Sequence, residues 1–230
     1  MNIISEFQTF MNAFDFSAIL NLIQGIIPAL ICITLHEICH GLAAWALGDN
    51  TAKNEGRLSL NPIKHLDVLG LLMMISFHVG WAKPVPVNMY NFKKPKLGMA
   101  ITALAGPLSN VLLTVVMLFL FGFLYIPLCS TDAGMFVLSM VQLTAYISLG
   151  FAIFNLIPVP PLDGSKILFS CLSDENYYKL MRYERYFSLA LILLLMSGVL
   201  GNSLSTVIGK LFYFLSGISG IGIKIMLNFM

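Results

Sequence analysis

Charged residues are scarce in this chain of 230 residues: they make up 10% of it, whereas hydrophobic residues make up 58%. Soluble domains carry about 25% charged residues, so this composition cannot cover a surface that faces water. The formal net charge is only +2, which excludes the polybasic field that nucleic-acid binding requires. The sequence therefore predicts an integral membrane protein that has the lipid bilayer as its surroundings and no nucleic-acid partner.

Cysteine is also rare, and its four positions show no disulfide framework. In apolar surroundings a cysteine usually packs as a small hydrophobic residue. The first 15 residues contain no Lys or Arg, so they lack the basic region of a cleaved signal peptide. We therefore expect the first apolar segment to remain in the mature protein.

Apolar runs dominate the rest of the chain, and a helix needs about 20 such residues to cross a bilayer. Five segments are candidates, at about 16–47, 97–126, 133–157, 186–200 and 207–229. The fourth is only about 15 residues long, so the alternative is that it lies at the membrane interface. The last two are separated by Gly201 and Asn202, which predicts a C-terminal helical hairpin over about 183–229. The expected fold is all-α, a polytopic transmembrane helix bundle. It forms a single domain over residues 1–230, with its core at about 16–170.

The stretch between the first and second segments has a different character. Its apolar run 66–81 is short for a span and is flanked by Lys64 and Lys83, so both ends should lie on one side of the membrane. We interpret it as a re-entrant or membrane-surface element. The neighbouring sequences GRLSLNP and GWAKPVPVN favour short irregular β-strands. Pro84 and Pro86 cannot donate to a ladder, which predicts a strand edge. This edge would accept a substrate strand, or it is a surface loop without a partner.

Basic residues indicate the orientation. Eleven of the thirteen Lys and Arg residues lie in the two stretches 48–96 and 158–185. The positive-inside rule places these stretches on the cytoplasmic side and the amino terminus outside. We therefore expect a multi-pass protein of the cell membrane whose active site opens toward the cytoplasm.

The first span contains the motif His36-Glu37-Ile38-Cys39-His40. Histidines at i and i+4 share one helical face, a spacing suited to zinc, and the adjacent Glu37 can accept a proton from a metal-activated water. Ionisable groups inside a span usually mark function, although a polar helix–helix contact is the alternative. At 1.5 Å per residue, His36 lies about 16 Å from Leu47, so a polar cavity must bring water to this depth. We interpret Cys39 as a packing residue.

A catalytic zinc needs a third protein ligand and an open position. The sequence NLIPVPPLDG, residues 155–164, supplies Asp163, and its three prolines break the third span at the cytoplasmic end. A broken helix at membrane depth is tolerated where it lines a cavity. We therefore predict one zinc ion held by His36, His40 and Asp163. The alternative for Asp163-Gly164 is an ordinary turn.

The sequence resembles the site-2 protease family of intramembrane zinc metalloproteases. The resemblance rests on HEICH within a span, on NLIPVPPLDG, and on GPLSN at 106–110, which is similar to the family's GPxxN element. It implies that the protein cleaves a peptide bond in or beside a transmembrane segment of a membrane protein or peptide. It also implies zinc on His36, His40 and Asp163, with Glu37 as general base. By the same resemblance Asn155 belongs to the active site and assists at the oxyanion; the alternative is a cap on the unwound backbone.

Several further points follow from the residues. Gly106 predicts a close helix approach and Asn110 a hydrogen bond across the bundle; the alternative for both is a role in substrate gating. His65 and His78 are assigned to the membrane interface and not to the metal. The chain leaves no room for an inserted PDZ domain, and the oligomeric state stays open.

Two other functions compete with the resemblance. A divalent-metal transporter would use the same His, Glu and Asp cluster, but transporters commonly show paired repeats with matching broken helices. Another membrane zinc-protease architecture completes the HExxH helix with a downstream glutamate. Among the acidic residues after the second span, only Asp163 lies in a proline break.

Overall fold

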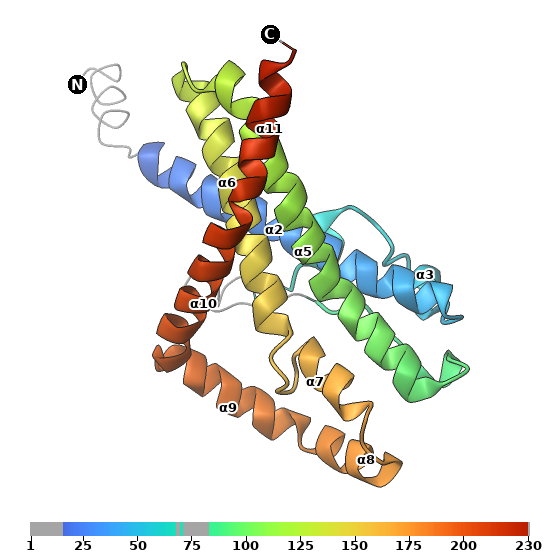
Figure 1. The fold of residues 1–230 in the computed structure, drawn as a ribbon. Helices are drawn as coiled ribbons and strands as arrows, with labels where there is room; N and C mark the ends of the chain where they lie inside the picture. The colour runs from blue at the N-terminus through green and yellow to red at the C-terminus, as the bar shows by residue number, and fades with distance from the viewer. Residues whose placement is uncertain (1–15, 68–69, 71–82, 230) are drawn as a thin grey trace, which may run out of the picture.

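The computed structural model describes residues 16–67, 70 and 83–229, and this part of the chain is helical (Figure 1). Its elements in chain order are α2 (Phe16–Ala46), α3 (Thr51–Asn54), η1 (Pro62–His65), η2 (Met89–Asn91), α5 (Pro95–Leu128), α6 (Asp132–Asn155), α7 (Asp163–Phe169), α8 (Asp174–Arg182), α9 (Glu184–Met196), α10 (Val199–Leu215) and α11 (Gly217–Leu227). The predicted all-helical class is therefore confirmed.

The small β element expected before the second span is not seen in the described residues. Leu66 forms an isolated bridge, and the Lys83 N–H donates to the His65 carbonyl at 2.9 Å, but residues 83–88 form no regular strand. Most of the expected re-entrant run 66–81 lies outside the described residues. Two prolines in Lys83–Val87 remove the N–H donors that a ladder needs, which explains the irregular backbone.

Within the part of the chain that the structure describes, four helical segments are long and apolar enough to cross a membrane, judged by length and composition. They are Ile23–Ala46, Pro95–Leu128, Asp132–Asn155 and Val199–Leu227. The first three agree with the predicted spans, so the chain is a multi-pass membrane protein.

At the C-terminal end, the structure favours the alternative in which the fourth predicted segment does not cross the membrane. The fourth predicted segment corresponds to α9, whose 13 residues are too few to cross a bilayer. The turn after it falls at Gly198, with φ of +73°, whereas Gly201 and Asn202 lie inside α10. A left-handed φ suits glycine because it has no Cβ. The last span is thus formed by α10 and α11 together.

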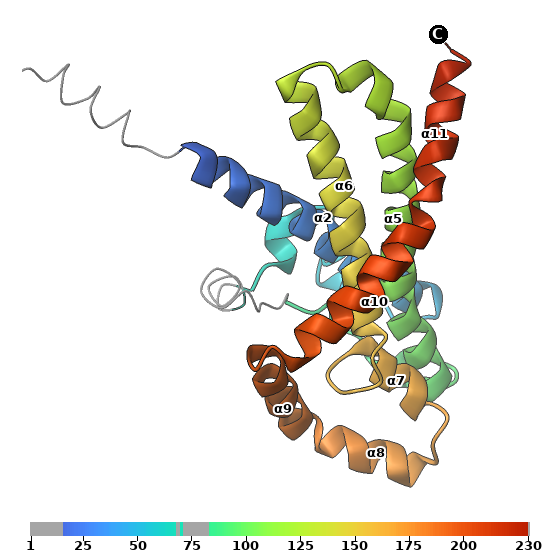
Figure 2. The ribbon, with the colours of Figure 1, turned by 60° about the vertical axis from the view of Figure 1, so that its left-hand side comes forward.

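Helix α5 is central to the bundle and contacts α2, α6, α7 and α11. Figures 1 and 2 show α5 and α6 side by side, with α11 along α5 and α2 crossing the pair. Glycines permit the closest approach: a Cβ on Gly122 would lie 1.8 Å from the Ser219 carbonyl oxygen of α11. Small residues at helix contacts are typical of membrane bundles.

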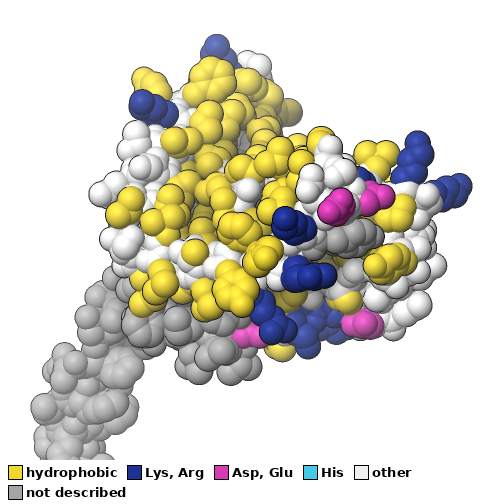
Figure 3. Space-filling view, turned by 90° about the horizontal axis from the view of Figure 1, so that it is seen from below, with side chains coloured by type: hydrophobic (Ala, Val, Ile, Leu, Met, Phe, Trp, Pro, Cys, Tyr) yellow, Lys and Arg dark blue, Asp and Glu magenta, His cyan; other side chains and the backbone are white. Residues whose placement is uncertain are grey.

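The two ends of the bundle differ. The connection from α5 to α6 and the C-terminus lie at one end, and α7, α8 and α9 lie at the other (Figures 1 and 2). Lys and Arg side chains are spread over this second end, together with Asp and Glu (Figure 3). The metal centre described next lies on the side where α2 ends and α7 begins.

A buried carboxylate, Asp49, ties the residues after α2 to the segment before α5. It accepts hydrogen bonds from the Asn88 N–H at 2.7 Å and from the Asn91 side-chain amide at 2.7 Å. It also accepts the Thr51 N–H at 3.0 Å and the Thr51 hydroxyl at 2.5 Å. Burial acts to raise the pKa of Asp49, and these hydrogen bonds outweigh it and hold the pKa below its ordinary value.

Candidate metal centre

Three side chains from two distant parts of the sequence meet at one point. His36 and His40 lie on one face of α2, and Asp163 is the first residue of α7. Asp163 Oδ2 lies 3.1 Å from His36 Nε2 and 3.1 Å from His40 Nε2. The two Nε2 atoms are 3.0 Å apart. The structure therefore brings together the three predicted metal ligands.

This donor set fits a zinc ion in chemistry and in size. Two imidazole nitrogens and a carboxylate oxygen are ligands that zinc commonly takes, at about 2.0 Å, and the edge of such a tetrahedron is about 3.3 Å. The measured separations of 3.0–3.1 Å are close to that edge. The three residues are only 6–9% exposed, and a buried cluster of ionisable groups is expected to be paired or to coordinate metal.

The orientation of the imidazoles is set by α5. His40 Nδ1 lies 2.7 Å from the Thr102 carbonyl oxygen, so Nδ1–H donates there, and with a metal bound the lone pair would be on Nε2. His36 Nδ1 lies 3.2 Å from the side-chain amide of Asn110. The predicted hydrogen bond of Asn110 across the bundle is therefore present, and its partner is a candidate metal ligand.

Gly106 of α5 makes room for both rings. A Cβ at this position would lie 2.5 Å from His40 Nε2 and 2.7 Å from His36 Cε1. The close approach predicted for Gly106 is thus an approach of the α5 backbone to the two imidazoles.

The break between the end of α6 and the start of α7 positions Asp163 at the site. After Asn155 the helix stops, and α7 begins at Asp163, so the alternative of an ordinary turn at Asp163-Gly164 is wrong. A Cβ on Gly164 would lie 2.3 Å from the Leu156 carbonyl oxygen. Glycine is therefore needed for the first turn of α7 to pack against the end of α6.

A lysine, Lys166, lies beside the carboxylate of Asp163. Lys166 Nζ lies 3.6 Å from Asp163 Oδ1, one helical turn along α7. Burial acts to raise the pKa of Asp163, but hydrogen bonds from His36 and His40 and the charges of His40 and Lys166 hold it well below its ordinary value. The carboxylate is therefore ionised, as a metal ligand must be.

Glu37 lies beside the cluster without belonging to it. Its Oε2 accepts the Val85 N–H at 2.7 Å, which links the HExxH helix to the segment Lys83–Val87. That segment is held in turn by Arg57, whose guanidinium donates to the Lys83 carbonyl at 2.7 Å and to the Pro84 carbonyl at 3.1 Å. This arrangement leaves the Glu37 carboxylate on the wall of the cavity described next.

A cavity of about 520 Å³ joins these groups. The polar and ionisable side chains among its lining residues are His36, Glu37, His40, Thr102, Asn155, Asp163 and Lys166. A water molecule occupies about 30 Å³ in the liquid, so the cavity has room for water and for part of a larger substrate. Asn155 donates from Nδ2 to the Phe151 carbonyl at 3.0 Å, which holds its amide at the cavity wall.

The remaining predicted histidine and cysteine positions lie away from the metal centre. Cys39 is not part of the cluster, and His65 is buried, with Nε2 bonded to the Ser59 carbonyl at 2.8 Å. His78 lies outside the described residues.

Two site groups were not predicted. Lys166 follows Asp163 by three residues and would have been found from helical spacing. Thr102 acts through its backbone carbonyl, for which a sequence gives no signal.

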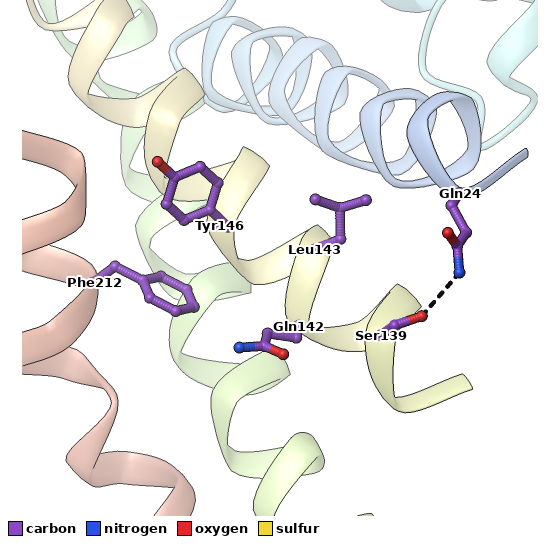
Figure 4. Close-up of a pocket in the computed structure, with 6 residues that line it drawn as sticks. All are labelled: Gln24, Ser139, Gln142, Leu143, Tyr146 and Phe212. Carbon is purple, nitrogen blue, oxygen red and sulfur yellow. Dashed lines mark hydrogen bonds between the residues drawn. The ribbon is translucent and has the colours of Figure 1, made fainter. Parts of the chain in front are cut away.

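A second pocket, of about 320 Å³, lies between α2, α6 and α10 (Figure 4). It is lined by Gln24, Ser139, Gln142, Leu143, Tyr146 and Phe212. The Gln24 amide donates to the Ser139 hydroxyl at 3.0 Å. None of these side chains is a His, Cys, Asp or Glu, so this pocket offers no ligand set like that of the first cavity.

Comparison with known proteins adds independent information. Residues 126–198 match Peptidase family M50. The protein named "Putative zinc metalloprotease YwhC" of Bacillus subtilis is 38% identical over 167 residues, which cover 70% of this chain and 74% of that protein. "Putative zinc metalloprotease Rip2" of Mycolicibacterium smegmatis is 30% identical over 178 residues, covering 75% and 66% of the two chains. The Rip2 protein of Mycobacterium tuberculosis is 29% identical over 195 residues, covering 83% and 73%. No solved structure matches the chain.

Proposed function

The chain belongs to peptidase family M50, a family of zinc metalloproteases, and from this premise we propose that it cleaves within membranes. Its substrate is a membrane protein, and the hydrolysed peptide bond lies in or near a transmembrane segment. The observation that carries the proposal is the buried cluster of His36, His40 and Asp163, which shares a cavity with Glu37. Both histidines belong to a helix that is long and apolar enough to span a bilayer.

One zinc ion would be held by His36, His40 and Asp163. When bound, zinc supplies a Lewis acid that polarises a peptide carbonyl and makes a water molecule acidic near neutral pH. The protein contributes the fixed triangle of donor atoms and the α5 contacts that orient the imidazoles.

Glu37 acts as the general base in this proposal. Its carboxylate accepts a proton from the attacking water and returns it to the leaving amine. The Val85 N–H on Oε2 orients the carboxylate and leaves the other oxygen for the proton. Such a positioned base contributes typically about 10²–10⁴-fold to the rate.

Asn155 is proposed to assist at the developing oxyanion. One amide proton is used by the Phe151 carbonyl, and the second remains for the substrate. A single donor of this kind is worth about 3 kcal/mol in a water-excluded site. The bond to Phe151 also explains how the amide is held where α6 ends.

Substrate recognition would use the segment Lys83–Val87. A transmembrane helix hides its carbonyls in intrahelical bonds, so the target must unwind locally before hydrolysis. Pro84, Val85 and Val87 line the cavity, and the Val87 N–H has no hydrogen-bond partner among the described residues. An extended substrate would pair with this backbone edge. The basic residues in 48–96 and 158–185 support a cavity that opens to the cytoplasmic side of the cell membrane.

The test compares the wild type with Glu37→Gln, each coexpressed with tagged single-span membrane proteins. We expect a shortened substrate fragment with the wild type and at least about a 10²-fold loss with Glu37→Gln, because the amide cannot accept the proton. Zinc content should stay unchanged, since Glu37 is not in the ligand cluster.

The matched control is Glu55→Gln, which makes the same change at an exposed position outside the cavity. It should cleave like the wild type. Cleavage by Glu37→Gln at the wild-type rate would refute the assignment of the base.

The competing functions gain no support from the described residues. A downstream glutamate does not complete the site, since the cluster contains Asp163, and Glu184 begins α9 instead. Nothing specific favours a divalent-metal transporter. Metal flux in proteoliposomes without any peptide cleavage would support the transporter function instead.

A further inference from the structure

The side chain of Asn110 is a fully enclosed polar group near the metal centre. Asn110 is 0% exposed, and its Nδ2 lies 3.2 Å from His36 Nδ1. Its Oδ1 is buried without a hydrogen-bond partner among the described residues. Buried polar atoms are normally paired, so an unpaired carbonyl oxygen beside a candidate ligand needs an explanation.

The protonation of His36 indicates which end of the Asn110 amide should face the imidazole. A neutral imidazole carries one proton, so a ring that binds metal through Nε2 has its proton on Nδ1. The group opposite Nδ1 must then be an acceptor. His40 meets this requirement with the Thr102 carbonyl at 2.7 Å, but an amide NH₂ cannot meet it for His36.

We infer that Asn110 is a positioning residue for the metal centre, whose side-chain carbonyl accepts the His36 Nδ1–H and fixes Nε2 toward the ion. Rotation of the amide by half a turn exchanges its oxygen and nitrogen and places Oδ1 opposite Nδ1. The two ends of an amide are nearly equal in shape, and hydrogen bonding decides which faces a partner. The inference rests on the zinc site of the proposed function.

The backbone around Asn110 is held firmly enough for this role. Its carbonyl accepts the Thr114 hydroxyl at 2.9 Å and the Ser148 hydroxyl of α6 at 2.8 Å. Thr114 and Ser148 are themselves 0% exposed. The backbone at Asn110 is therefore fixed by contacts within α5 and with α6, and the short distance from its side chain to His36 does not depend on a flexible loop.

Zinc affinity separates this role from simple helix packing. The full-length protein is purified in detergent, and its zinc dissociation constant is measured by competition with a chelating dye. Asn110→Leu retains the shape but has no acceptor, so we expect zinc to bind about 10–100-fold more weakly. Asn110→Asp supplies an acceptor that faces His36 in either rotation. We expect its zinc affinity to stay within about threefold of the wild type or to rise.

A control variant distinguishes a general loss of bundle stability from the inferred role of Asn110 in zinc binding. Thr144→Val removes a buried hydroxyl of α6 whose hydrogen bond goes to the Met140 carbonyl and not to His36. Its zinc affinity should equal that of the wild type. Thermal unfolding of every variant in excess chelator reports whether the fold itself has changed.

Each result decides between the interpretations. Asn110→Leu that folds and binds zinc like the wild type would overturn the inference. So would a folded Asn110→Asp that binds zinc about 10-fold or more weakly than the wild type, and this comparison decides the question if Asn110→Leu does not fold. A wild type that binds no zinc would instead count against the site of the proposed function, and the inference would fall with it.

Discussion

At the scale of single residues, the metal centre depends on the absence of a side chain at Gly106. The α5 backbone passes so close to α2 at this point that the two imidazoles occupy the space where a Cβ would be. Real Cβ atoms do not approach other heavy atoms to 2.5 Å, so any side chain here must displace a ring or the helix. Catalytic groups tolerate little displacement, because a shift of about 1 Å can cost about 10²-fold in rate.

We predict that Gly106→Ala weakens zinc binding at least about tenfold while the helix content stays unchanged, because alanine favours helix. The measurement is zinc competition together with circular dichroism in detergent. Gly209→Ala is the matched control, since a Cβ at Gly209 of α10 meets nothing within 4 Å. Equal zinc affinity in the two variants would contradict the steric role of Gly106.

At the scale of elements, the cavity wall depends on the contact between the end of α2 and the segment before α5. Asp49 binds the N–H of Asn88 and the side chain of Asn91, and Arg57 holds the carbonyls of Lys83 and Pro84. Hydrogen bonds to charged groups contribute about 1.5–3 kcal/mol each when buried. These contacts set the position of Val85, whose N–H orients Glu37.

The lowered pKa of Asp49 predicts how this contact responds to acid. The folded state favours the carboxylate, so its stabilisation is fully present above the ordinary pKa of 3.8 and is lost as the pH falls below it toward the folded-state pKa. We expect amide hydrogen exchange in 83–92 to accelerate between about pH 4 and pH 3 beyond the change due to intrinsic exchange.

Asp49→Asn tests that assignment, because an asparagine does not titrate. It should exchange faster in 83–92 near neutral pH and should lack the additional acceleration in acid. The same acid response in wild type and Asp49→Asn would assign the effect to another group.

At the scale of the whole molecule, the four candidate spans of the described residues predict that the start of α2 and the end of α11 lie on the same side of the membrane. α2, α5, α6 and the α10–α11 pair alternate in direction through the bundle (Figure 2). The connection from α5 to α6 and the C-terminus lie at one end, and α7–α9 lie at the other (Figure 1). With five spans the C-terminus would instead lie at the end that carries α7–α9.

Two exposed cysteines test the orientation inferred from the basic residues. Cys129 lies in the connection between α5 and α6, and Cys171 lies between α7 and α8. We expect a membrane-impermeant maleimide to label Cys129 but not Cys171 in intact cells. Cys129→Ser should therefore remain unlabelled until the membrane is permeabilised, whereas Cys171→Ser should be labelled at once. Labelling of Cys129→Ser in intact cells would reverse the orientation.

Much of the bundle was predictable because its signals are local. The first three spans follow from apolar runs, and α2, α5 and α6 begin and end within a few residues of the predicted limits. The C-terminal part was predicted less well, since Gly201 and Asn202 suggested a turn that Gly198 forms instead. Glycine is frequent inside membrane helices, and asparagine there can hydrogen-bond to a neighbouring helix. The presence of these two residues alone therefore does not locate a turn.

The sequence by itself determined that the chain belongs in a membrane and that His36 and His40 share a helical face. Composition is a property of the whole chain, and i, i+4 spacing concerns about one helical turn. Both predictions can therefore be made without knowing how the helices pack. Only the tertiary structure decided that Asp163, 127 residues after His36, lies 3.1 Å from it. The Thr102 carbonyl, the Asn110 amide and the gap left by Gly106 likewise depend on how α5 crosses α2. Such contacts depend on the relative positions of α2 and α5 in space, and these positions result from the packing of the whole bundle and not from local sequence.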